Sequence, residues 1–180
     1  MTFPRVRAMI FVAVLFVTAG VVVLTAINKD TQTQPPQERC RPGQVRVNVE
    51  VPEDRSKVTI NVLNGSPSRN GLAQQVGAEF SHRGFTVAKM EDSPEGEFSG
   101  VARLVYGPEG VGAAWLVSAY FLPAYFLDGD AEKIFDIERV GPEVDVILGN
   151  KFQQLATSSE VNQAIAQEGA PIPPAGTCEA

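Results

Sequence analysis

The segment from Gly65 to Gly71 (GSPSRNG) combines the residue types that suit an anion-binding loop. It joins a predicted strand to a predicted helix, where free backbone N–H groups and the helix dipole favour negative charge. Side-chain donors are added by Ser66, Ser68, Arg69 and Asn70, which make this loop the candidate binding site for a carboxylate or phosphate group. The favoured interpretation is an ordinary turn, in which the glycines satisfy backbone angles and the Ser and Asn side chains only cap the helix.

Other side chains with catalytic potential have no partners at a useful spacing. The single histidine, His82, ends the predicted helix beside Arg83, where its expected role is a solvated residue that favours the helix dipole. Four carboxylates share one loop and are interpreted as a solvated acidic loop, with general acid–base work as the alternative: Glu91, Asp92, Glu95 and Glu97. With no nucleophile elbow, P-loop or zinc helix, we predict no catalytic residue, no metal and no cofactor.

Aromatic residues gather in the uncharged stretch from Val111 to Leu127. They are Trp115, Tyr120, Phe121, Tyr125 and Phe126. Gly112 and Pro123 interrupt the stretch and acidic residues flank it, so we predict a buried helix ending near Pro123 and not a second membrane span. Core packing is the expected role of the rings, and an acyl or lipid pocket is the alternative.

Residues 8–27 form twenty consecutive residues without a charge. A helix of this length spans about 30 Å, the thickness of the hydrocarbon core of a bilayer. Arg5 and Arg7 precede it, so the positive-inside bias predicts a cytoplasmic tail at 1–7 and an extracytoplasmic chain from Asn28 onward. The alternative, a cleaved signal peptide, would have a shorter apolar run and a small residue in place of Leu24.

Two cysteines flank the rest of the chain, at Cys40 and Cys178. A bond between them would tie together both ends of the domain, and it would persist only in an oxidising compartment. Free thiols in the tails, or an intermolecular bond, are the alternatives. We predict the intramolecular disulfide, which agrees with an extracytoplasmic domain.

Hydrophobic periodicity divides the remainder into a linker at 28–44, a domain at 45–152 and an irregular tail at 153–180. Strands are expected at 45–51, 58–63, 85–90, 101–106, 134–137 and 144–148, with helices at 71–83 and from 111 to near Pro123. This order predicts an α+β fold, an α/β sandwich of one sheet and two helices. Without the first strand, the core order β-α-β-β-α-β fits a ferredoxin-like arrangement.

Three short stretches carry a resemblance to a known family. They are Val62-Leu63-Asn64-Gly65-Ser66, Gly71-Leu72-Ala73 and Arg83-Gly84-Phe85-Thr86-Val87. Together with looser matches at 105–108 and 145–149, they make the chain similar to the LytR C-terminal domain family over about 58–152. The resemblance implies that in other proteins this domain follows a phosphotransferase domain. This chain has no room for that catalytic domain.

The resemblance, with an anchor before a lone domain, implies a role in cell envelope integrity and a link to virulence in pathogens. We therefore expect a non-catalytic, single-pass inner-membrane protein that binds peptidoglycan, an envelope glycolipid or another envelope protein. The net charge of −6, without a basic run, argues against nucleic acid. The alternatives are an envelope hydrolase or transferase that uses the acidic loop, and a small lipid carrier built on the aromatic helix.

Overall fold

A five-stranded mixed sheet in the order β3-β2-β6-β4-β5 forms the centre of the protein. We describe it from a computed structural model, in which residues 40–121 and 131–180 are described. The strands are β2 (Thr59–Asn64), β3 (Thr86–Asp92), β4 (Ala102–Tyr106), β5 (Glu132–Phe135) and β6 (Val144–Leu148). The predicted mixed α+β class is confirmed, and each of these strands begins and ends within two residues of its predicted bounds.

The sheet consists of two β-α-β units joined by β6. Helix α2 (Leu72–His82) connects β2 to β3, and these strands are parallel neighbours. Strands β4 and β5, on either side of α3 (Val111–Ser118), are also parallel neighbours. Strand β6 pairs parallel with β2 and antiparallel with β4. The predicted ferredoxin-like arrangement is wrong, because it requires another strand between the two parallel strands of each unit.

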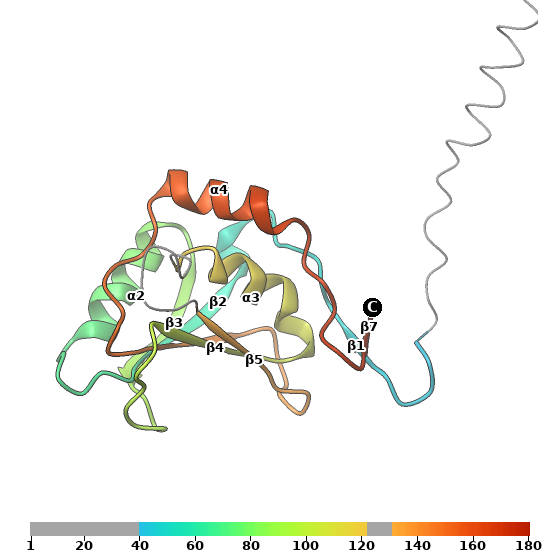
Figure 1. Cartoon of the computed structure of the whole chain (residues 1–180), viewed down its shortest axis with the longest axis horizontal. Helices are drawn as coiled ribbons and strands as arrows, with labels where there is room; N and C mark the ends of the chain where they lie inside the picture. The colour runs from blue at the N-terminus through green and yellow to red at the C-terminus, as the bar shows by residue number, and fades with distance from the viewer. Residues whose placement is uncertain (1–39, 122–130) are drawn as a thin grey trace, which may run out of the picture. The chain divides into compact units, whose positions relative to one another are not determined.

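The helices lie on one side of the sheet (Figure 1). Alternate strand residues face them and form the core together with the helices: Ile60, Val62, Ala102, Leu104, Val144, Val146 and Leu148. The opposite face is covered by no described helix (Figure 1). Leu63 and Ile147 on that face are nevertheless buried, and the 93–100 loop runs beside them through hydrogen bonds to Asn64 and Gly65.

Helix α3 is buried on nearly every side, as its lack of charge predicts. Seven of its eight residues are buried, Trp115 being the half-buried one. It ends at Ser118, earlier than the predicted end near Pro123, and residues 122–130 lie outside the described residues. None of the helices within 40–121 and 131–180 is long and apolar enough to cross a bilayer. The predicted anchor at 8–27 lies outside the described residues.

The predicted irregular tail is wrong, because it holds a third helix and a strand. Helix α4 (Ser158–Glu168) begins with a capping box in which Thr157 and Glu160 satisfy each other's backbone N–H groups. Val161 is buried, and Ala164 and Ile165 pack against the core. These residues follow helical spacing, so the sequence contained a signal for this helix.

The first and last strands form a separate two-stranded parallel sheet, so the expectation of a single sheet is corrected. Strand β1 (Val45–Val47) pairs with β7 (Thr177–Glu179). Beyond Val47 the predicted strand leaves the ladder, because the Asn48 N–H donates to the Pro108 carbonyl and the Asn48 carbonyl accepts from Gly112. A Cβ on Gly112 would lie 2.0 Å from the Glu50 carbonyl oxygen, so only glycine allows this crossing.

The predicted disulfide between Cys40 and Cys178 is present, with the two Cα atoms 5.6 Å apart. It reinforces the β1–β7 pairing, since Cys178 lies within β7 and opposite Arg46. The two ends of the described chain are therefore joined at one pole of the domain.

Removal of the disulfide should destabilise the domain without changing its fold. The bridge closes a loop with a sequence separation of 138 residues, for which loop-closure entropy gives about 5 kcal/mol, an upper value. We expect the Cys40→Ser/Cys178→Ser double variant to lower the free energy of unfolding by about 2–5 kcal/mol in urea titrations. The unmodified chain in reductant should match the double variant, and an unchanged midpoint in both cases would contradict a structural role.

Candidate functional site

The carboxyl ends of three parallel strands lie side by side along one edge of the central sheet, across the strand direction and distinct from its edge strands. Strands β2, β3 and β6 all run toward this edge, so the loops that follow them, 65–71, 93–101 and 149–157, lie beside one another. Ligands of open α/β sheets bind at this kind of edge, where parallel strands deliver their loops. The predicted ligand loop therefore occupies the position at which such a sheet most often carries a site.

Asn64, the last residue of β2, organises these loops. Its Nδ2 donates to the Asp92 carboxylate at 3.1 Å and to the Arg69 carbonyl at 3.2 Å. Its Oδ1 accepts from the Ser66 backbone N–H at 3.0 Å. One buried side chain thus holds the turn after β2 and joins it to the end of β3.

Gly65 and Ser66 are parts of the interior. The Gly65 N–H donates to the Leu148 carbonyl at 2.8 Å, and a Cβ on Gly65 would lie 3.0 Å from Ile147 Cγ2. Ser66 is fully buried, and its Oγ has no hydrogen-bond partner among the described residues. A ligand on the protein surface would therefore not contact the Ser66 side chain.

The other three predicted site residues lie at the surface. Ser68 and Asn70 are exposed and Arg69 is half-buried. The Arg69 Nη1 donates to the Phe152 carbonyl, with the guanidinium carbon 6.0 Å from the centre of the Phe152 ring. The expected cap by Asn70 is wrong, because the N-cap of α2 is Gly71 at φ 76° and no side chain caps it. Arg69 thus already binds the segment that follows β6.

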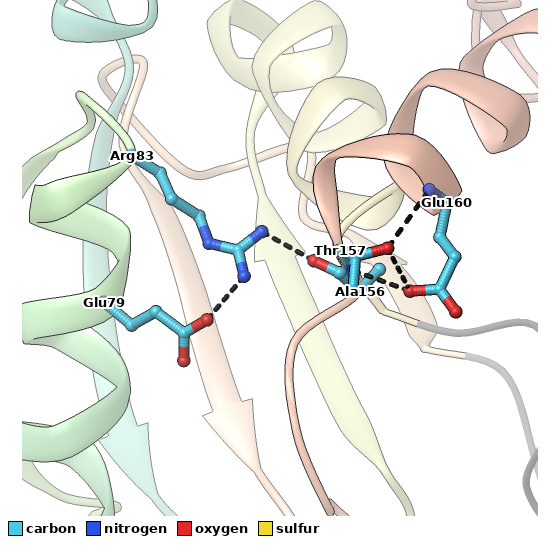
Figure 2. A network of polar contacts seen from close by, with 5 residues as sticks. All are labelled: Glu79, Arg83, Ala156, Thr157 and Glu160. Carbon is cyan, nitrogen blue, oxygen red and sulfur yellow. Dashed lines mark hydrogen bonds and ion pairs between the residues drawn. The ribbon is translucent and has the colours of Figure 1, made fainter.

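A second arginine holds the same segment from the other end of α2 (Figure 2). Arg83 pairs with Glu79 one turn earlier and donates through Nη1 to the Ala156 carbonyl at 2.6 Å. The Ala156 N–H donates to the Tyr120 carbonyl at 2.8 Å. Thr157 starts the capping box of α4, so Arg83 attaches the residue just before that helix to the end of α2.

Two residues of the predicted aromatic set, Tyr120 and Phe121, pack against other rings, and Trp115 packs partly buried against the core. Tyr120 lies 5.1 Å from Phe85 and 5.6 Å from Phe80 between ring centres, and Phe121 contacts Phe152. The Arg83 guanidinium lies 5.4 Å from the centre of the Tyr120 ring. These contacts agree with the expected core role. Tyr125 and Phe126 lie outside the described residues.

The residues of the acidic loop are exposed, and three have structural partners. Asp92 accepts from Asn64, Glu97 from Asn150 and Glu95 from Arg103. His82 is exposed at the last residue of α2. Within 40–121 and 131–180, no three potential metal-ligating side chains come together.

Sequence reasoning missed a polar cluster on the face of the sheet opposite the helices. Asp145 in β6 accepts two hydrogen bonds from Arg139, each 2.8 Å long, and one of 2.7 Å from Asn61 in β2. Burial alone would raise the pKa of the Asp145 carboxyl, but the hydrogen bonds from Arg139 and Asn61 outweigh it, and the pKa is lowered. Asp145 stands between Val144 and Val146 in a predicted strand, and this alternation was the available signal for a polar residue on the other face of the sheet. Its partners could not be identified from sequence, because they depend on strand order.

Comparison with known proteins identifies one family. The profile of the family described as LytR cell envelope-related transcriptional attenuator matches residues 57–152, more than half of the chain. Among solved structures, the soluble domain of a conserved hypothetical secreted protein from Mycobacterium marinum is similar. It shares 23% identity over 68% of this chain and 82% of that one, with a TM-score of 0.49. No curated protein matches the chain.

The contact of Arg83 with Ala156 should stabilise the start of α4. Replacement by Gln removes a charged donor from a half-buried carbonyl, so we expect Arg83→Gln to lower the free energy of unfolding by about 1–3 kcal/mol. Amide exchange should accelerate most at the beginning of α4. The exposed Arg46→Gln should stay within about 0.5 kcal/mol of the parent, and equal effects of the two variants would contradict the assignment.

The stabilisation from Asp145 should depend on pH. Its pKa is lower in the folded protein than in the unfolded chain, so its contribution is complete above the unfolded value of about 3.9 and is lost as the pH falls through the folded value. We expect Asp145→Asn to lower the free energy of unfolding by about 1.5–3 kcal/mol at neutral pH. In urea titrations the gap to the parent should narrow below about pH 4. Glu53→Gln, at an exposed site, should show no such change, and a gap that stays constant down to pH 3 would refute the role of Asp145.

Proposed function

This chain belongs to the LytR C-terminal domain family of cell envelope-related proteins, and on that premise we propose that it is a membrane-anchored, non-catalytic module. Its domain lies outside the cytoplasm and supports envelope integrity by binding an anionic envelope polymer such as peptidoglycan. The chain carries one such domain behind an apolar segment.

Two features support the location. The uncharged run at 8–27 follows Arg5 and Arg7, which favour a cytoplasmic N-terminus. The bond between Cys40 and Cys178 requires an oxidising compartment to persist. Both features agree with a single-pass inner-membrane protein whose residues from Asn28 onward are extracytoplasmic.

A binding role is supported by how the reactive side chains are used. The carboxylates of Asp92, Glu95 and Glu97 each accept a hydrogen bond from a neighbouring loop or strand. The arginines at both ends of α2 likewise hold backbone carbonyls after β6. Side chains of this kind build a rigid loop platform, which suits recognition better than bond cleavage.

The observation that carries the proposal is the position of the 65–71 loop at the edge where β2, β3 and β6 end. Ser68 and Asn70 are exposed there, next to the start of α2, where backbone N–H groups and the helix dipole attract anions. Arg69 adds a positive charge at the same place. Carboxylates and phosphates of the cell wall are therefore the favoured ligand groups.

The test uses the full chain in mild detergent and isolated peptidoglycan. The Ser68→Glu/Asn70→Glu variant places two negative charges on exposed loop positions, and we expect it to reduce co-sedimentation with peptidoglycan by about fivefold or more. The control Asn162→Glu/Gln163→Glu adds the same charge to the exposed side of α4 and should bind as the parent does. Arg69→Gln should also weaken binding.

Equal binding by the loop variant and its control would remove this loop as the site. Capture of a glycolipid or a protein in place of the polymer, lost in the same loop variant, would keep the site and change the ligand. The location is tested separately with a reporter fused after Ala180, which should be active only outside the cytoplasm. A cytoplasmic reporter would refute the envelope role.

A further inference from the structure

An open groove lies on the face of the sheet opposite the helices, over strands β4 and β5. Its floor is apolar and comprises Val105 of β4, Ile134 of β5 and Ile137 just after β5. Glu95, Asp136 and Glu138 form its walls. We call this surface the β4–β5 groove.

Exposed apolar side chains are concentrated beside this groove. Of the five large hydrophobic residues exposed in the described chain, three lie between positions 134 and 140. Ile134 is 38% exposed, Ile137 51% and Val140 90%. Single exposed apolar residues are ordinary, but here Ile134 and Ile137 line one groove and Val140 follows them within seven residues, which indicates a contact surface.

Carboxylates outnumber cations among the residues that line the groove. Its one cation, Arg103, is already neutralised by two carboxylates, with 3.0 Å to Glu95 and 2.8 Å to Glu132. The nearby Arg139 is held by Asp145. Asp136 shares the charge of Arg139 with Asp145, and Glu138 forms no ion pair with a described residue, so an occupant with positive charge would complement this end of the groove.

The two edges of the sheet differ in how well they are protected. Both edge strands expose charged residues, but only β3 carries an irregularity in its pairing, at Ile60/Asn61 of β2, which discourages a further strand. Strand β5 pairs with β4 in uninterrupted register, and no strand within the described residues pairs with its other edge. A peptide can add to such an edge through its main chain and place alternate side chains over the neighbouring groove.

We propose that the β4–β5 groove binds an extended segment of a partner protein that carries both basic and apolar side chains. Apolar side chains contact Ile134 and Ile137, while lysine or arginine side chains pair with Asp136 and Glu138. The proposal requires neither the 65–71 loop nor the membrane anchor, so the two sites can be tested independently.

The test titrates the full chain in mild detergent with a fluorescent Lys-Val-Lys-Val-Lys-Val peptide and follows anisotropy. The matched Glu-Val-Glu-Val-Glu-Val peptide controls for alternation without positive charge. We expect the basic peptide to bind at least tenfold more tightly and its affinity to fall as salt is raised. A photoreactive valine at the centre of the peptide should crosslink to residues 132–138.

Two variants and a control separate the groove from the rest of the surface. Glu138→Lys reverses a wall charge and Ile137→Ser removes apolar floor, and each should weaken the basic peptide by about fivefold or more. Glu53→Lys makes the same charge change at an exposed site outside the groove and should leave binding unchanged. Native disulfide content and thermal unfolding confirm that the variants fold.

Other outcomes would overturn the proposal. Equal binding of the acidic and basic peptides, or crosslinks outside 132–138, would exclude charge-selective binding here. Dimers that Ile137→Ser dissociates would make a second copy of the chain the occupant. Binding to anionic vesicles that depends on Ile137, without peptide binding, would make the groove a lipid contact.

Discussion

The parallel pairing of β2 with β6 is the interaction on which the rest of the structure depends. Strand β6 also pairs with β4 of the second β-α-β unit, so its pairing with β2 joins the two units into one sheet. It also brings Gly65 against Leu148, with an N–H donated at 2.8 Å between strands that are far apart in sequence. A Cβ at position 65 would lie 3.0 Å from both Ile147 Cγ2 and the Leu148 carbonyl oxygen, so a larger residue would force these neighbours to shift.

That pairing also positions the two surfaces that we propose as binding sites. At the edge where β2, β3 and β6 end, Asn64 and two arginines bind the loops to one another and leave Ser68 and Asn70 at the surface. On the face opposite the helices, β6 places Asp145 between Asn61 and Arg139. The first surface, formed by the loops after β2, β3 and β6, is rigid and rich in donors. The second surface is the β4–β5 groove, which lies beyond Asp145 and is apolar with acidic walls. The ligands that we propose for the two surfaces therefore carry opposite charges.

Helix α4 shows how a segment with an available signal can be overlooked. Pro171, Pro173 and Pro174 suggested an irregular tail, yet they follow the helix and do not interrupt it. Thr157 and Glu160 form the capping box, and Val161, Ala164 and Ile165 recur at helical spacing. Local hydrogen bonds start this helix and can be read from sequence. Its attachment to the domain through Arg83 and Ala156 cannot, because 73 residues separate the two partners.

The sequence by itself determined the local elements and the chemistry available at each position. The alternation of valines and the spacing of Leu72, Val76 and Phe80 specify strands and a helix through short-range periodicity, and two cysteines at the ends allow a single intramolecular bond. Only the tertiary structure decided the order of the strands, the end of β1 before Val49 and Val51, and the burial of Ser66. The physical reason is that these features depend on contacts between residues distant in sequence, where periodicity carries no information about the partner. Arg69 illustrates the difference, because its charge was evident from the sequence but its partner, the Phe152 carbonyl, was set by the pairing of β2 with β6.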